Sequence, residues 1–314
     1  MKVIIISGAT ATGKTDLSIK IAQHFGGEII NFDSLLLYKE LNIGTAKPTK
    51  LERGEIPHHM IDVTSISTPL NAADYMRMAL PIIESILADH KMPILVGGSG
   101  FYLQALLNGM YESQTSPQEV LERSKILFEK EGIEPFRYIL KQNDLTSYER
   151  YHVNDHYRIR RAVEHFWTTG TPLSEKRKKK DQENEEFQST NIHGWQTLHL
   201  YLKIPKEDHW QIINKRTERM ISDGLIDEVN SLLKNGFSGF EKPLQSIGYK
   251  EAMDLIKGEL KSLEECKEKI SISTRQLAKA QKTWFNRIQD KKTFNPLLDH
   301  HDIVQTIEDF LDKK

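Results

Sequence analysis

Eight consecutive residues near the N-terminus have the types and spacing of a phosphate-binding loop, G-x-x-x-x-G-K-[ST]. The glycines let successive backbone N–H groups point at phosphate oxygens, and a helix that begins at Lys14 adds its positive end. Lys14 supplies a point charge, and the hydroxyl of Thr15 is a ligand for Mg²⁺. The loop therefore predicts a bound phosphate compound and Mg²⁺ as cofactor, but not which compound. Its residues are Gly8, Ala9, Thr10, Ala11, Thr12, Gly13, Lys14 and Thr15.

Such a loop needs a strand before it and a helix after it, and the sequence predicts both. Apolar runs that alternate with amphipathic segments over the first hundred residues favour an α/β fold with a parallel sheet. We predict a core like that of the P-loop nucleoside-triphosphate hydrolases, with an inserted helical subdomain and C-terminal helices. The expected strands of the core are residues 2–7, 28–32, 93–96 and possibly 58–63, and its helices are residues 14–25 and 72–88.

Two other strand ends carry residues that could join the loop. Asp33 and Ser34 follow one expected strand, and Ser99 follows another after two glycines. Open α/β sheets bind ligands at the carboxyl ends of their strands, where a carboxylate such as Asp33 could act as a general base. Asp33 could equally be a cap or turn residue, and Ser99 part of a tight strand-to-helix turn. Position alone leaves these alternatives open.

The aspartate that supports the metal in many ATPases and GTPases is missing from the expected place. The strand at residues 93–96 runs into Gly97 and Gly98 instead of ending in a carboxylate. Asp62 is the other candidate, and a single carboxylate with no defined partner favours a structural role over a metal site.

Beyond residue 110 the pattern becomes helical and polar. We expect helices over 119–130 and 155–168, a returning strand over 197–204, and helices within 208–235, 249–256 and 263–289. The predicted organisation is a first part of the core (1–110), an inserted helical subdomain (111–195), and a return strand with C-terminal helices (196–314).

Bulk composition is that of an ordinary globular protein. The 314 residues include 38% hydrophobic and 28% charged residues, and the formal net charge is −1. The apolar runs are too short to span a bilayer, so we expect no membrane association. A single cysteine, Cys266, rules out an internal disulfide framework, fits a reducing cytoplasm, and is interpreted as a packing residue. We expect a cytoplasmic monomer.

Basic residues are clustered although the net charge is close to zero. One predicted helix places Arg275, Lys279, Lys282 and Asn286 on one face, because their spacings are four, three and four. Ile270, Leu277 and Trp284 mark another face. The basic face could bind a phosphate backbone or simply be a solvated helix surface.

Together these features resemble the tRNA dimethylallyltransferase family, also called tRNA isopentenyltransferases. Order and spacing agree over most of the chain. The matching segments are the phosphate loop, Asp33-Ser34 with Tyr38, 42–48 (NIGTAKP), 58–62 (HHMID), 72–74, 93–103 (PILVGGSGFYL), Asn154-Asp155 with Arg158 and Arg161, Gly224-Leu225 with Glu228-Val229, 247–251 (IGYKE), and Ala278-Lys279 with Gln281 and 283–285.

The resemblance implies transfer of a dimethylallyl group from dimethylallyl diphosphate to N6 of the adenosine next to the anticodon. Asp33 corresponds to the family's proposed base, and Lys14 and Thr15 with Mg²⁺ would stabilise the leaving diphosphate. Arg216 matches a diphosphate-binding arginine, and Ser99 falls where a threonine contacts the donor or the base. The partner would be the anticodon stem-loop of tRNA, with the target adenine flipped out. The implied tRNA contacts are Asp33, Ser34, Leu35, Leu36, Ser99, Arg123, Tyr157, Arg158, Ile159, Arg160, Arg161, Arg275, Lys279 and Gln281.

The sequence departs from the family pattern mainly at positions that bear on RNA. Leu36 stands where the family has a glutamine, and a leucine cannot hydrogen-bond a base. Ala280, His156 and Ile212 replace an arginine, a proline and an arginine, respectively. We expect altered or weaker recognition of the target base.

Three alternatives remain open. A P-loop kinase for a small metabolite shares the loop and the core, and an adenylate isopentenyltransferase uses the same donor on a free nucleotide. An RNA-binding relative without activity is the third, and Leu36 and Ala280 are its only support, whereas Lys14, Thr15 and Asp33 argue against it.

Overall fold

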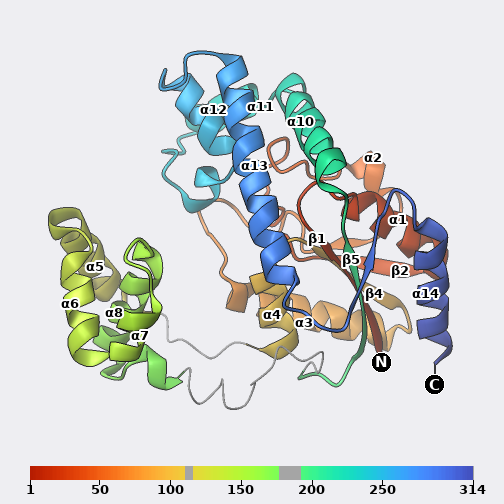
Figure 1. Ribbon diagram of the computed structural model, residues 1–314, viewed down its shortest axis with the longest axis horizontal. Coiled ribbons are helices and arrows are strands. Elements are labelled where there is room, and N and C mark those ends of the chain that lie inside the picture. Colours follow the sequence, from red (N-terminus) through yellow and green to blue (C-terminus); the bar gives the residue numbers. More distant parts are fainter. Residues whose placement is uncertain (110–115, 177–191, 314) are drawn as a thin grey trace. The chain divides into compact units, whose positions relative to one another are not determined.

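The computed structural model of the protein describes residues 1–109, 116–176 and 192–313 (Figure 1). The chain divides into two compact units, one formed by residues 1–109 and 188–314 and the other by residues 110–187. The first unit contains the sheet and is interrupted in sequence by the second, which is helical in its described part.

The first unit is built on a parallel sheet of six strands in the order β3-β2-β4-β1-β5-β6. β1 lies between β4 and β5, and β4 separates β1 from β2. The carboxyl ends of β1, β2 and β4 therefore lie next to one another at one edge, as expected for a ligand-binding α/β sheet. The strands are β1 (Lys2–Gly8), β2 (Gly27–Asn31), β3 (His58–His59), β4 (Met92–Gly97), β5 (Gln196–Leu202) and β6 (Lys291–Phe294).

Helices cover both faces of the sheet, which is why its central strands are apolar without alternation. On one face Ile4 and Ile6 pack with Leu17 and Ile21 of α1 and with Ile303 of α14. On the other face His199 and Tyr201 of β5 contact Phe285 of α13. The first unit's helices are α1 (Lys14–Phe25), α2 (Lys50–Arg53), α3 (Ala72–Ala88), α4 (Gly100–Asn108), α10 (Lys206–Ser222), α11 (Leu225–Lys234), a 3-10 turn η1 (Lys242–Gln245), α12 (Tyr249–Ile256), α13 (Leu263–Phe285) and α14 (His300–Asp312).

Expected and observed elements agree best where periodicity is strong. Helices α1, α3 and α12 have the predicted limits. The possible strand over 58–63 is wrong in extent, because Met60 and Asp62 adopt left-handed backbone conformations and β3 contains two residues. The stretch 208–235 is two helices, which separate at Gly224, where φ is 100°. Helix α13 ends at Phe285, before the predicted 289.

The predicted apolar face of α13 needs a correction. Leu277 is 39% exposed. The buried residues of the helix include Cys266, Ile270, Ala278 and Phe285. Cys266 is fully buried in a hydrophobic cluster, so its interpretation as a packing residue is confirmed.

In its described part the second unit is a small helical bundle with its own core. Phe136, Leu140, Ile159 and Val163 are buried together, and Asp155 caps the helix that carries the basic residues. Its helices are α5 (Gln118–Glu131), α6 (Glu134–Asn143), α7 (Leu145–Arg150) and α8 (His156–Thr169).

The last strand and helix of the chain were not predicted from the sequence. Helix α14 nevertheless completes the sheet core, since Ile303 is fully buried against β5 residues.

We expect Ile303→Ala to lower the free energy of unfolding by about 2–5 kcal/mol, because it leaves a cavity. Equilibrium urea unfolding measures this. The exposed Gln305 on the same helix is the control, with an expected change of about 0.5 kcal/mol or less for Gln305→Ala. Equal midpoints for the two variants would place α14 outside the core.

Candidate functional site

The phosphate loop connects β1 to α1 in the required conformation. Gly13 has a φ of 76° and Ala11 a φ of 60°, so the loop turns through left-handed positions before the helix begins at Lys14. The Thr12 hydroxyl donates to the Ala9 carbonyl at 2.9 Å and closes the turn. Gly8 is required because a Cβ atom there would lie 2.7 Å from the Thr12 hydroxyl oxygen. The loop is thus folded as a cradle at the carboxyl end of β1.

The side chain of Lys14 lies back on its own loop. Its Nζ donates to the carbonyls of Gly8, at 3.1 Å, and Ala9, at 2.7 Å. Burial lowers the pKa of Lys14 to about 8, with a further lowering from Arg216 and an opposing effect of Asp33. A phosphate oxygen can replace the two carbonyls as hydrogen-bond partner of the Lys14 amine. Its negative charge would also keep the amine protonated.

Arg216 of α10 approaches the same place from the C-terminal part of the chain. Its Nη2 donates to the Thr45 carbonyl at 3.0 Å. Burial lowers the pKa of the guanidinium, and Asp33 opposes this shift. Lys14, Asp33 and Arg216 therefore interact electrostatically. Arg216 does so although it is distant in sequence from the other two. Two cations around one carboxylate leave one positive charge for an anionic ligand.

Asp33 lies in a turn directly after β2. Its Oδ1 accepts from the Leu35 N–H at 3.2 Å, and its own N–H donates to Asn31 Oδ1 at 2.8 Å. Asn31 is anchored in turn, because its Nδ2 donates to the Met60 carbonyl at 2.8 Å. Asp33 thus orders its own turn, which is one of the two interpretations left open by the sequence. It also interacts electrostatically with Lys14 and Arg216, and its role as a general base stays a prediction.

The end of β4 holds the Asp33 turn close to the phosphate loop. Ser99 Oγ accepts from the Ser34 N–H at 3.0 Å and donates to Ser34 Oγ at 3.3 Å. A Cβ atom on Gly97 would lie 2.8 Å from the Asp33 nitrogen, so only glycine allows this approach. Ser99 is therefore a turn residue that also belongs to the site.

Helix α13 hydrogen-bonds the phosphate loop through Gln281, a side chain for which the sequence implies only a tRNA contact. Gln281 Oε1 accepts from the Thr10 N–H at 2.7 Å, and Gln281 Nε2 donates to the Gly98 carbonyl at 2.9 Å. The opposite side of the same peptide segment is held by His209, whose Nε2 lies 2.8 Å from the Thr10 carbonyl oxygen. His209 carries no motif signal, so its contact was missed. Only the fold brings these helices to the loop.

Asp62 has a structural environment, as its sequence context favoured. Its carboxylate pairs with Lys47 at 2.6 Å and lies 3.4 Å from Arg53. Among residues 1–109, 116–176 and 192–313, no group of three or more His, Cys, Asp or Glu side chains could hold a metal. Mg²⁺ bound to a phosphate substrate needs only one or two protein oxygens. The Thr15 hydroxyl, at the start of α1, suits that arrangement.

Departures from the family pattern lie beside this site. Leu36 is half-buried, and its carbonyl accepts from the Asp62 N–H at 3.1 Å. Leu35 is half-buried too. Ile212 packs against the apolar cluster of Ala9, Ala11, Ile213 and Ala278 behind the loop. Leu36 and Ile212 therefore place apolar side chains next to the site at two of the positions where the family has polar ones.

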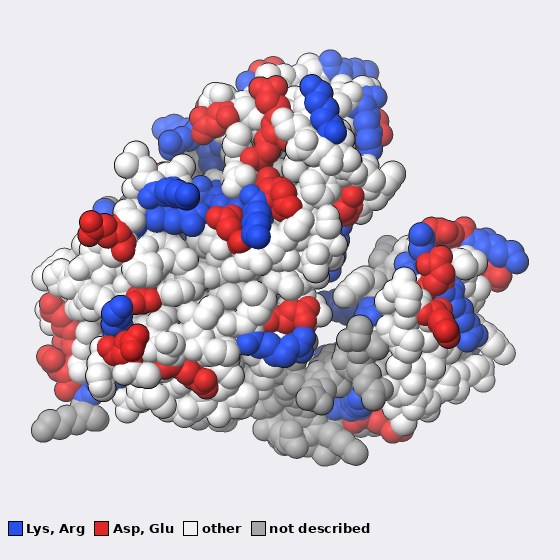
Figure 2. Space-filling view, turned by 180° about the vertical axis from the view of Figure 1, so that it is seen from behind, with Lys and Arg blue, Asp and Glu red and all other residues white. Residues whose placement is uncertain are grey.

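Predicted tRNA contacts in the first unit include the exposed part of α13. Lys279 is exposed, and the Arg275 guanidinium lies 5.0 Å from the ring centre of Trp210, which is itself 42% exposed. On the face of the molecule in Figure 2, basic and acidic groups are interspersed rather than forming one continuous basic field.

Predicted tRNA contacts in the second unit fall into two groups. Tyr157 is 65% exposed, and Arg158 is exposed and pairs with Asp155. By contrast, Ile159 is 1% exposed within the helical core, so its side chain adds nothing to the outer surface and that assignment needs correction. Arg160 and Arg161 lie beside the buried Glu164, and Arg123 stacks on Trp167 with 4.0 Å to the ring centre.

The pKa of Lys14 predicts a pH effect on anion binding. The amine loses its charge as pH rises through about 8, so the affinity for pyrophosphate falls by up to about tenfold per pH unit above that value. Calorimetric titration from pH 7 to 9.5 measures it, and Lys14→Gln in the same buffers shows the ligand's own contribution. Parallel slopes for the two proteins would contradict the prediction.

The stability of the unliganded protein has the opposite pH dependence. Because the pKa of Lys14 is lower in the folded than in the unfolded state, the unfolded state binds more protons between pH 8 and 10.5, and the free energy of unfolding rises with pH there.

Comparisons with known proteins place this chain in a family. The model of the family described as IPP transferase matches residues 36–288. The tRNA dimethylallyltransferase of Syntrophobacter fumaroxidans is 36% identical over 310 residues, covering 98% of this chain and 87% of the relative. A tRNA dimethylallyltransferase of Citrifermentans bemidjiense is 37% identical over 290 residues, covering 92% and 90% of the two chains.

Solved structures agree with these sequence relatives. The tRNA isopentenylpyrophosphate transferase of Staphylococcus epidermidis superposes with a TM-score of 0.68 at 34% identity and covers 98% of this chain and 99% of its own. A eukaryotic dimethylallyltransferase captured acting on tRNA gives a TM-score of 0.80 at 29% identity, with 99% of this chain and 79% of the other covered. The chain belongs to the IPP transferase family.

Proposed function

We propose that the protein transfers the dimethylallyl group of dimethylallyl diphosphate to N6 of the adenosine adjacent to the anticodon of tRNA. The observation that carries this proposal is the electrostatic interaction of Lys14, Asp33 and Arg216 at the phosphate loop. The neighbouring strand, β4, ends in glycine. Asp33 provides a carboxylate that can accept a proton, and the two cations that interact with it can bind a diphosphate. Curated relatives over nearly the whole chain carry the name of this activity.

In the proposed reaction one carbon–oxygen bond breaks and one carbon–nitrogen bond forms. N6 attacks the first carbon of the allyl group, diphosphate leaves with the bonding electron pair, and Asp33 takes the proton released from N6. The exocyclic amine of adenine is a weak nucleophile, so both a base and a stabilised leaving group are needed. Lys14 and Arg216 offset the charge that develops on the diphosphate. Mg²⁺ held by Thr15 would add Lewis-acid stabilisation of the same leaving group.

The acceptor base would enter beside the turns that follow β2 and β4. Ser34 and Ser99 offer hydroxyl groups there, and Leu35 and Leu36 offer apolar surface. An adenine stacked in an anticodon loop reaches such a site only after it flips out. Within the first unit, the exposed face of α13 supplies Arg275 and Lys279 for phosphate contacts; within the second, Arg123, Tyr157 and Arg158 are available.

Partition of a labelled donor tests the proposal against its alternatives. The protein is incubated with dimethylallyl diphosphate labelled in the allyl group, Mg²⁺, total tRNA and AMP. We expect label in tRNA. Label in AMP would instead indicate an adenylate isopentenyltransferase. Label in neither would overturn the proposal in favour of a kinase, which ATP consumption would detect, or an inactive RNA-binding relative.

Replacing the proposed base separates chemistry from binding. Asp33→Asn keeps an oxygen that can accept from the Leu35 N–H, so the turn is preserved, but it removes proton acceptance. We expect the single-turnover rate of transfer to tRNA to fall by about 10²- to 10⁴-fold, with donor affinity changed much less. Rapid-quench assays and calorimetry provide the two quantities. A variant that transfers at the native rate would remove Asp33 from the mechanism.

Leu36 predicts altered recognition of the target base. Leu36→Gln introduces the hydrogen-bonding side chain typical of the family at a half-buried position next to Leu35. We expect faster prenylation of anticodon stem-loops under subsaturating RNA, by about 5- to 30-fold for one well-placed hydrogen bond to the base. Leu51→Gln, on an exposed leucine of α2, is the matched control and should leave the rate unchanged. Equal rates for native protein and Leu36→Gln on the same substrates would refute this interpretation.

A further inference from the structure

The Glu228 carboxylate, which has no part in the proposed reaction, binds the loop that contains Thr45, the hydrogen-bond partner of Arg216. Glu228 lies in α11, and its oxygens accept backbone N–H bonds from Asn42 at 3.2 Å and Ile43 at 3.0 Å. The Gly44 N–H lies 3.5 Å from the same carboxylate. Three successive N–H groups that converge on one anion form a backbone nest. In this protein the nest is filled by a side chain of its own chain.

Tyr249 completes the arrangement from α12. Its hydroxyl donates to Glu228 Oε1 at 2.5 Å, and the residue is fully buried. Burial and the adjacent carboxylate raise the pKa of Tyr249 far above its ordinary value, so the hydroxyl stays a donor. Gly44 lies flat against the ring, since any Cβ atom there would overlap it. Glu228 thus receives bonds from two directions and has little freedom.

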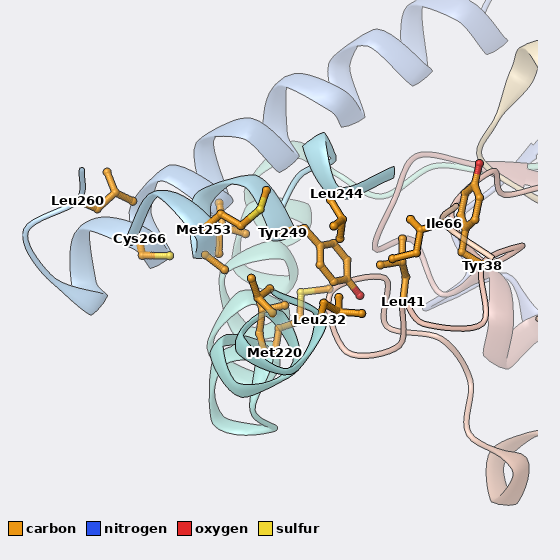
Figure 3. Packing of buried hydrophobic residues seen from close by; sticks show 14 residues of the cluster. Tyr38, Leu41, Ile66, Met220, Leu232, Leu244, Tyr249, Met253, Leu260 and Cys266 are labelled. Carbon is orange, nitrogen blue, oxygen red and sulfur yellow. The ribbon is translucent and has the colours of Figure 1, made fainter. Parts of the chain in front are cut away.

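The contact between Glu228 and Tyr249 lies on a buried hydrophobic cluster. Tyr249 belongs to a buried cluster that joins Leu41 and Ile66 to Leu232 and Leu244 of the C-terminal part (Figure 3). The figure shows its ring among these side chains. Asn42 follows Leu41 directly, so the nest begins where the chain leaves this core. Glu228 of α11 and Tyr249 of α12 therefore both contact this loop from the C-terminal part of the chain.

The next residue of the loop connects the nest to the phosphate site. Thr45 follows Gly44, and its carbonyl accepts the 3.0 Å hydrogen bond from Arg216. We propose that Glu228 and Tyr249 are positioning residues that fix the Thr45 carbonyl and, through it, direct Arg216 toward the diphosphate of the donor. The inference rests on the proposed function for the identity of the donor.

Binding of dimethylallyl diphosphate to single variants, measured by calorimetry with Mg²⁺, tests the proposal. We expect Glu228→Gln to raise the donor Kd about tenfold, because the amide lacks the charge that holds three N–H groups. Tyr249→Phe, which keeps the ring, is expected to raise it about threefold. The exposed neighbour Asp227 is the matched control, and Asp227→Asn should bind as the native protein does. KM for the anticodon stem-loop should change less than about twofold in every variant.

A merely structural role would reduce the fraction of folded protein, which lowers the stoichiometry of binding and leaves Kd unchanged. A native donor Kd in both Glu228→Gln and Tyr249→Phe would overturn the proposal. The route through Arg216 is tested in the Arg216→Lys background, where Glu228→Gln should have little further effect on Kd; an undiminished effect there would also overturn it. If the native protein binds the donor but transfers nothing to tRNA, the proposed function fails while the donor Kd values still test the positioning role.

Discussion

The site depends on an imbalance of charge. Lys14 and Arg216 are partly removed from water and share one carboxylate, Asp33, so desolvation is only partly offset until an anion arrives. Burial already lowers the pKa of both cations. An arrangement of this kind is costly for the free protein and becomes favourable when a diphosphate supplies the missing negative charge. In the proposed reaction, the same arrangement would place the Asp33 carboxylate beside the leaving diphosphate, where a base is needed for the proton that the transfer releases.

Two parts of the fold satisfy this constraint in different ways. The parallel sheet sets β1, β2 and β4 side by side, and the glycines at the end of β4 let the Asp33 turn approach the phosphate loop. The C-terminal helices then close on that edge: Gln281 and His209 hold Thr10 from two sides, and Arg216 enters from α10. The sheet therefore supplies the phosphate cradle, and the C-terminal helices supply its second cation and its restraints.

The sequence predicts what depends on local pattern. A complete phosphate-loop motif with its flanking strand and helix identifies the residues from Gly8 to Thr15, and periodicity places α1, α3 and α12. Contacts that depend on tertiary structure could not be read in this way. His209 belongs to no motif, and Glu228 lies in a segment that matches the family without indicating a role. Only packing brings the two side chains to backbone groups near the site. Leu277 and Ile159 show the converse, because helical spacing alone does not reveal which face a neighbouring element covers.

In the proposed reaction, the apolar Leu35-Leu36 segment offers no hydrogen bond to the acceptor base, so Ser34, Ser99 and Asp33 would have to orient it. The most direct measurement of the central claim is a crystal structure with a non-hydrolysable dimethylallyl thiolodiphosphate, Mg²⁺ and an anticodon stem-loop. The account predicts diphosphate oxygens on the loop amides, Lys14 and Arg216, and the adenosine N6 within about 3.2 Å of the Asp33 carboxylate. A diphosphate bound away from the loop, or an N6 directed away from Asp33, would contradict it.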